Sequence, residues 1–243
     1  MKSILKAAVI ALAIVWSAWL IGDSYVERGN PDGTIQVTGL GEKDFSSNLI
    51  VWAGYYNAEN VDLAKAYEEL QRQKDLIKAY LIEKGVNQEQ IVFNAVQTRK
   101  NMKKQYTPNG DYMGEKFEGY QLTQSLKIES KEVEKIEKIS REITELLNQG
   151  VQFYSQSPLY YYTQLADLKI EMISKATEDA RLRAEKIAEN SGATLGDLNS
   201  ARMGVFQITG QNSNENYSWG GTFNTRSKEK TASITMKLEF EID

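Results

Sequence analysis

Residues 163–192 carry the clearest helical pattern in the chain, with apolar side chains recurring at helical spacing from Leu165 to Ile187. The second half of this stripe has small residues four positions apart: Ala176, Ala180, Ala184 and Ala188. Small side chains on a buried stripe let a helix lie close to its neighbour, because the distance between packed elements depends on the side chains at the contact. The pattern therefore predicts a long helix that packs closely on a sheet.

The C-terminal segment, residues 232–242, alternates apolar and polar side chains without a break, which is typical of an antiparallel strand with one buried face. Shorter strand patterns precede it at residues 35–38, 49–56, 91–98, 120–128, 151–154 and 201–208. Two further helical patterns, at residues 60–84 and 130–147, complete the order ββαββαβαββ. This order predicts an α+β fold in which three main helices pack on mixed or antiparallel sheets.

Polar residues and glycines mark the expected ends of these elements. N-cap side chains are expected at Asn60, Ser130 and Thr163. Glycines that end helices are expected at Gly85, Gly150 and Gly192. Gly39 and Gly41 predict a tight turn after the first strand, and residues 107–111 (TPNGD) predict the turn of a long hairpin. We expect residues 34–243 to form one folded body, in which two lobes would meet near residue 130.

A short uncharged segment stands near the N-terminus. Residues 1–6 contain Lys2 and Lys6, and the apolar run from Ala7 to Ile21 follows without a charge. Positive charge before such a run predicts that residues 1–6 stay in the cytoplasm while the chain beyond crosses the membrane. As a helix the run would reach only about 22 Å, against about 30 Å of hydrocarbon. Residues 7–22 are therefore either a transmembrane anchor or a signal peptide.

We favour the anchor, because no A-x-A cleavage site stands in the right place. Residues 23–33 read as a linker, since RGNPDG within them has no apolar period. The body is then expected in the periplasm, held to the inner membrane by residues 7–22, and cleavage of a signal peptide is the alternative. Either alternative predicts a protein of the cell envelope.

The absence of Cys and His removes whole classes of chemistry from the chain. Without them the chain has no disulfide, no thiolate nucleophile, no Ser-His-Asp triad and no ordinary zinc site. The formal net charge of -4 argues against a general nucleic-acid binder, which needs a basic face. No motif assigns a catalytic, cofactor-binding or metal-binding residue, so we expect a protein that is not an enzyme and carries no cofactor.

Three groups of residues are candidates for contacts with partners. The dense basic run Arg99, Lys100, Lys103 and Lys104 is either a contact for anionic phospholipid or other polyanions, or the solvated tip of the hairpin, which we favour. The other two groups are aromatic: Tyr160, Tyr161 and Tyr162, and, in the loop 210–227, Tyr217, Trp219 and Phe223. The tyrosines predict a sugar platform, a subunit contact or a partly buried strand end. The loop predicts a glycan or peptide site or a mobile hairpin connection, and the mobile connection is the more usual.

Several of these segments resemble the SIMPL-domain family. The pattern I-x-V-x-G-x-G at residues 35–41 is similar to the family's opening strand, and GYQL at residues 119–122 is similar to its "GY" strand. The most specific part is ATEDARLRAEKIA at residues 176–188, followed by Gly192 and a Leu-Gly pair. An alternating strand at the C-terminus completes a resemblance that covers residues 33–242.

The resemblance implies an exported bacterial α+β protein that self-associates, with a link to oxidative stress or envelope integrity. The family has no agreed catalytic residues, so the resemblance assigns none. We therefore expect a non-enzymatic envelope protein that forms a homo-oligomer, contacts the membrane through its N-terminal segment and does not bind nucleic acid. The alternative is a module that binds cell-wall glycan or peptide, or another small molecule, through the aromatic loop 210–227.

Overall fold

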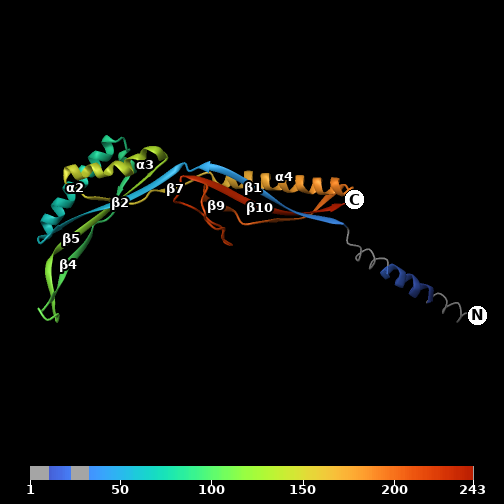
Figure 1. Cartoon of the computed structure of the whole chain (residues 1–243), viewed down its shortest axis with the longest axis horizontal. Coiled ribbons are helices and arrows are strands. Elements are labelled where there is room, and N and C mark those ends of the chain that lie inside the picture. Colours follow the sequence, from blue (N-terminus) through green and yellow to red (C-terminus); the bar gives the residue numbers. More distant parts are fainter. Residues whose placement is uncertain (1–10, 23–32, 243) are drawn as a thin grey trace, which may run out of the picture. The chain divides into compact units, whose positions relative to one another are not determined.

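The computed structural model of the chain describes residues 11–22 and 33–242 (Figure 1). One helix spans residues 11–22. The elements after residue 33 are, in chain order, β1 (Thr34–Ser46), β2 (Leu49–Asn60), α2 (Leu63–Glu83), η1 (Gln88–Gln90), β3 (Ile91–Phe93), β4 (Gln97–Tyr106), β5 (Tyr112–Ser130), α3 (Val133–Glu142), η2 (Ile143–Gln149), β6 (Phe153–Ser155), β7 (Leu159–Tyr161), α4 (Leu165–Ser191), β8 (Leu195–Met203), β9 (Gln207–Gly210) and β10 (Glu229–Ile242).

The predicted α+β class is confirmed, and the sheet pairings between named strands are antiparallel wherever their register is defined. The described residues contain four α-helices, one more than the three main helices of the prediction, because residues 11–22 are also helical. Among these residues, no helix has the length and apolar character of a membrane span. The predicted anchor at residues 7–22 begins outside the described part of the chain and stays a prediction.

The chain divides into two compact units. Of the described residues, the first unit comprises those up to residue 42, 171–205 and 233–242, and the second comprises residues 43–170 and 206–232. Because β1, α4 and β10 are long, each of them contributes residues to both units.

In the first unit, α4 lies along a sheet in which β10 is flanked by β1 and β8 (Figure 1). The predicted small stripe faces this sheet, since Ala176, Ala180 and Ala184 are fully buried. Gly39 and Gly41 do not form the predicted turn, because β1 continues through both of them. A side chain at either position would collide with the α4 backbone, so these glycines are needed for close packing.

The packing of α4 on β1 also includes a polar contact. Asp179 Oδ2 accepts a hydrogen bond from Leu40 N at 2.8 Å and another from Arg183 Nε at 2.9 Å. These donors hold the pKa of the Asp179 carboxyl below its ordinary value, and the Leu40 N–H is the larger cause. Asp179 therefore ties α4 to β1, which is a structural role.

In the second unit, a six-stranded sheet has the order β3-β5-β2-β6, with β4 also paired to β5 and β7 to β2. Figure 1 shows α2 and α3 lying on this sheet. The core between them includes the fully buried Trp52, Ile77, Leu126 and Ile136. The alternation of β2 and the apolar stripes of the two helices thus meet in one hydrophobic core.

Two predicted strands are each divided in two, and one strand was not predicted. Residues 91–98 form β3 and the start of β4, and residues 201–208 contain the end of β8 and the start of β9. The aromatic run that follows the predicted strand 151–154 forms β7, which pairs with β2 beside β6. These short strands gain their hydrogen bonds from longer partners, and local residue pattern carries little information about such pairing.

The helix ends are only partly as predicted. Gly85, Gly150 and Gly192 have the positive φ values expected of glycines that end helices. All three predicted N-caps are wrong. Asp62 caps α2 by accepting from Ala64 N and Lys65 N, Glu132 precedes α3 without a side-chain bond, and α4 begins two residues after Thr163.

The side chains predicted as caps have other partners. Asn60 Oδ1 accepts from Asp62 N, and Ser130 Oγ accepts from Glu132 N, so each stabilises the turn that precedes a helix. Thr163 exchanges two hydrogen bonds with Asn48, which directly precedes β2. Several polar residues stand close to each helix start, and the tertiary contacts decide which of them becomes the cap.

Candidate interaction surfaces

The strands β4 and β5 extend as a two-stranded ribbon, defined here as residues 97–120 (Figure 1). None of the side chains from Gln97 to Glu118 is buried, whereas from Gly119 onward β5 has buried residues along one face. An isolated pair of strands is at best marginally stable in water. The ribbon is therefore a segment that a partner could cover.

Large apolar side chains are exposed along this ribbon. They are Met102, Tyr106, Tyr112, Met113 and Phe117, with exposed fractions between 37% and 65%. The register pairs Met102 with Phe117 and Tyr106 with Tyr112, so the members of each pair lie on one face. The ring centroids of Tyr106 and Tyr112 are 5.9 Å apart, and those of Phe117 and Tyr120 are 5.1 Å apart. Exposed apolar groups gathered in this way make the ribbon a candidate contact surface.

The predicted basic run lies on the same ribbon. Arg99, Lys100, Lys103 and Lys104 are all within β4, so their predicted place at the hairpin tip is wrong; the turn is at residues 107–111. The strand is longer than its apolar pattern suggested because backbone pairing with β5, not burial, maintains it. Lys103 Nζ lies 3.3 Å from a Glu118 carboxylate oxygen in an exposed ion pair. Lysines along a free strand edge disfavour uncontrolled edge pairing.

The loop between β9 and β10 has an internal polar framework. Buried Gln207 donates to Ser218 O at 2.8 Å and accepts from Thr222 N at 2.7 Å. Glu215 accepts from Gly210 N at 3.0 Å and from the buried Asn224 side chain. These bonds connect the two sides of the loop, so its shape is set by its own polar residues.

The loop presents aromatic side chains outside this framework. Trp219 is 100% exposed, Tyr217 is 66% exposed and Phe223 is 49% exposed. A fully exposed indole gives up the large free energy that its burial would contribute. On stability grounds alone, a tryptophan is therefore not expected at this fully exposed position.

Lys230 is a buried lysine beneath this loop, and the sequence analysis missed it. It is 2% exposed, and its Nζ donates to Tyr160 O at 2.6 Å. Burial lowers the pKa of Lys230 to about 8, and the nearby Glu215 carboxylate opposes this decrease. A sequence signal existed: Lys230 continues the buried alternation of Ala232 and Ile234 by one step.

We expect Lys230 to give the fold a distinctive pH dependence. Between its folded pKa of about 8 and an unfolded value of about 10.4, the unfolded chain binds more protons, so stability rises with pH. The expected gain in the free energy of unfolding is about 2 kcal/mol between about pH 7 and about pH 10. Denaturant unfolding across this range measures it, and Lys230→Met should lack the gain. An equal gain in both proteins would contradict the assignment.

The three predicted tyrosines do not form one exposed platform. Tyr160 is buried, and its backbone is held by Lys230 and by Thr225 O, which accepts from Tyr160 N at 2.7 Å. Tyr161 pairs with Leu49 in the sheet. Tyr162 packs against Phe45 with ring centroids 4.8 Å apart. Their contacts are those of a strand that anchors the loop.

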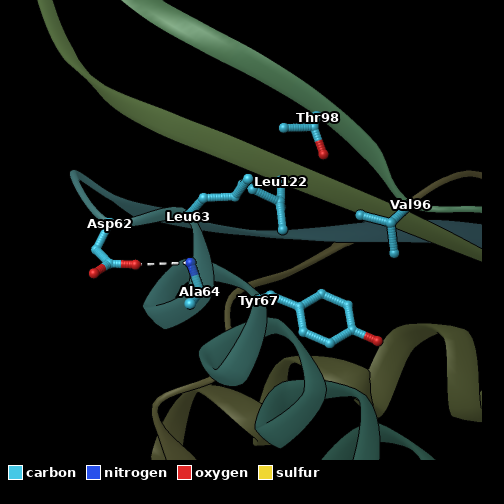
Figure 2. Close-up of a pocket in the computed structure, with 7 residues that line it drawn as sticks. All are labelled: Asp62, Leu63, Ala64, Tyr67, Val96, Thr98 and Leu122. Carbon is cyan, nitrogen blue, oxygen red and sulfur yellow. Dashed lines mark hydrogen bonds between the residues drawn. The ribbon is translucent and has the colours of Figure 1, made fainter.

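A pocket lies where the ribbon meets α2 (Figure 2). Its volume is about 610 Å³, and it is lined by Asp62, Leu63, Ala64, Tyr67, Val96, Thr98 and Leu122. Figure 2 shows the Tyr67 ring below Val96, and Leu63 beside Leu122. Both cap bonds of Asp62 use Oδ1, so its Oδ2 takes no part in the cap. The pocket thus has apolar walls and a carboxylate at one end.

The groups with the largest pKa shifts are dispersed. Burial raises the pKa of Tyr56, which donates to Gln124 Oε1 inside the core at 2.5 Å. Hydrogen bonds from Arg72 and Gln73 lower the pKa of Glu69 to about 2 on the exposed face of α2. Neither group lines the pocket. Within residues 11–22 and 33–242, no three Asp or Glu side chains gather in a way that could hold a metal ion.

The described residues thus form an α+β body with an uncovered ribbon and an exposed aromatic loop. A family model described as SIMPL, protein of unknown function (DUF541), matches residues 35–240. The chain therefore belongs to the SIMPL family, as its helix motif and opening strand predicted. No curated protein matches the sequence.

Proposed function

We propose that this chain is a non-enzymatic protein of the cell envelope that self-associates through the β4–β5 ribbon. The observation that carries the proposal is the ribbon itself. Five of its large apolar side chains are exposed, and the rest of the second unit covers neither of its faces. A second copy would remove this apolar surface from water. The mixed charge of the ribbon fits a reversible contact between folded copies better than a strand addition at its lysine-rich edge.

The envelope location is supported by the charge pattern of residues 1–22, with two lysines before the uncharged run. We propose that the body lies in the periplasm and that residues 7–22 anchor it in the inner membrane. A role in envelope integrity or in protection against oxidative stress is what the family resemblance supports. The absence of Cys and His supports a non-enzymatic role, since it removes the commonest nucleophiles and bases.

Light scattering of the full chain in a mild detergent tests self-association, because detergent covers the exposed apolar residues of the helix at 11–22. We expect a mass of at least two chains. The triple variant Met102→Ser, Tyr112→Ser, Phe117→Ser should have the mass of one chain, because it removes the apolar contact.

The matched control replaces three apolar residues of similar exposure away from the ribbon: Leu147→Ser, Leu182→Ser and Ile187→Ser. This control should keep the mass of the unaltered chain. A strict monomer for the unaltered chain at high concentration, or an undiminished mass for the ribbon variant, would refute the proposal.

A second candidate function is binding of cell-wall glycan or peptide by the loop 210–227. The fully exposed Trp219 on an internally bonded loop favours it, because an indole face stacks on sugar rings at little cost in ordering. Titration with cell-wall fragments should change the tryptophan fluorescence of the full chain, and Trp219→Phe should lose that change. An unchanged signal with every glycan and peptide fragment would rule the candidate out.

A further inference from the structure

We infer that Met102 and Met113 are sites of reversible oxidation, and that conversion of their thioethers to sulfoxides releases the ribbon contact between copies of this chain. Both residues belong to the β4–β5 ribbon. This inference rests on the proposed self-association and adds to it a chemical modification that controls the contact.

The sulfur chemistry of the chain belongs to its methionines, because the sequence has six Met and no Cys. A peroxide therefore finds no thiolate, and the thioethers are the sulfur atoms left to react. In the reaction the peroxide O–O bond breaks, one oxygen atom bonds to the methionine sulfur, and the rest of the peroxide leaves as water or an alcohol. The sulfur loses two electrons, and the peroxide gains them.

Exposure divides the described methionines into two classes. Met172 and Met236 are buried, with exposed fractions of 0% and 8%. Met102, Met113 and Met203 have exposed fractions of 45%, 65% and 61%. A peroxide in solution must reach the sulfur atom to react with it. The three exposed residues are therefore the reactive ones among the described methionines, and two of them lie on the ribbon.

Met102 lies within the apolar face of the ribbon. Its partner across the ribbon is Phe117, whose ring also lies against Tyr120. Tyr106 is four residues further along the same strand, so its side chain is on the same face as Met102. Tyr106 in turn pairs with Tyr112. A polar group introduced at Met102 therefore falls between two pairs of aromatic rings.

Met113 occupies a bulge of β5 close to the hairpin turn. The register pairs Gln105 with Gly114 and Tyr106 with Tyr112, so Met113 is an extra residue without a partner on β4. Its side chain is the most exposed of the large apolar side chains of the ribbon. The bulge thus presents a second thioether to solvent on the same ribbon.

Oxidation makes this surface more polar without adding a charge. A sulfoxide oxygen is a hydrogen-bond acceptor, and its burial at a contact without a donor costs free energy. Since the proposed contact depends on removing apolar surface from water, an oxidised ribbon gains less from association. Methionine sulfoxide reductases convert the sulfoxide back to the thioether, so the change is reversible.

Treatment of the full chain with hydrogen peroxide, in mild detergent, tests the inference. Mass spectrometry of peptides measures the sulfoxide at each methionine, and light scattering measures the mass of the assembly. At low protein concentration, Met102 and Met113 should oxidise at least about tenfold faster than the buried Met172 and Met236. The mass should then decrease from at least two chains to one, and reduction by methionine sulfoxide reductases should restore it.

Leucine variants provide the matched controls, because leucine keeps the apolar volume of methionine and has no sulfur. The double variant Met102→Leu, Met113→Leu should keep the mass of the assembly after the same treatment. Met203→Leu removes the exposed methionine of the first unit, and this variant should dissociate on oxidation as the unaltered chain does. Dissociation of the double variant by peroxide would overturn the inference, since the effect would then arise outside these two residues.

The untreated and the oxidised chain separate the two proposals. If the untreated chain assembles and keeps its mass after full oxidation of Met102 and Met113, the oxidation inference fails and self-association stands. If the untreated chain is a monomer, the proposed self-association fails and the oxidation inference fails with it.

Discussion

Alanine at Gly39 is expected to lower the free energy of unfolding by about 3 kcal/mol or more. The added Cβ would stand 2.5 Å from Ala180 N and 2.7 Å from Ala180 Cβ, and closer still to Ala176 O. Two of these atoms belong to the α4 backbone, which cannot move aside as a flexible side chain could. The helix must therefore lift from β1, and the buried alanine stripe loses part of its packing.

The measurement for Gly39→Ala is the midpoint of denaturant unfolding, with Gly220→Ala as the matched control. A Cβ at Gly220 has Ser218 Oγ at 4.0 Å as its nearest neighbour, so that variant should change stability by less than about 0.5 kcal/mol. Equal midpoints for the two variants would show that α4 does not lie against β1 at this position.

Replacing Trp52 by alanine should have the second large effect, a decrease of about 3–5 kcal/mol in the free energy of unfolding. Trp52 is fully buried in β2, and its ring lies 5.8 Å from that of Phe153. Its Nε1 donates to Ser155 Oγ at 3.0 Å, so truncation leaves both a cavity and a hydroxyl without this donor.

The same substitution at Trp219 provides the control for Trp52, because the two side chains have opposite exposure. Trp219→Ala should leave the unfolding midpoint within about 0.5 kcal/mol of the unaltered chain. A large loss at Trp219 would mean that its side chain is covered, for example by a second copy, and repeating the measurement at lower protein concentration would reveal that.

The local residue pattern predicted correctly those features whose signal lies within a single element. The alternation of β10, the glycines at the ends of three helices and the α4 stripe from Leu168 to Ala188 correspond to the structure. Ile187, which was predicted on the buried stripe, is 48% exposed. The signals of the correct features come from period and from backbone conformation, which depend on near neighbours in sequence. Local pattern failed for the N-caps and for the edges β3, β7 and β9, where distant partners decide the outcome.

The sequence also predicted only some features of the candidate surfaces. The sequence located the basic run and the aromatic loop, and it predicted the hairpin turn at residues 107–111. It did not predict that the ribbon projects uncovered, or that Lys230 is buried below the loop. The pocket was also beyond prediction, because it joins the first turns of α2 to the distant segments at Val96, Thr98 and Leu122.

The amino-acid sequence by itself determined the α+β class, the family, the longest helix and the C-terminal strand, because hydrophobic period and glycine placement are properties of contiguous residues. Only the tertiary structure decided that Gly39 is a contact point for α4, that Trp219 is fully exposed and that a pocket stands at the base of the ribbon. These three features depend on contacts between segments that are distant in sequence. The burial or exposure of a side chain is decided only when such segments pack together.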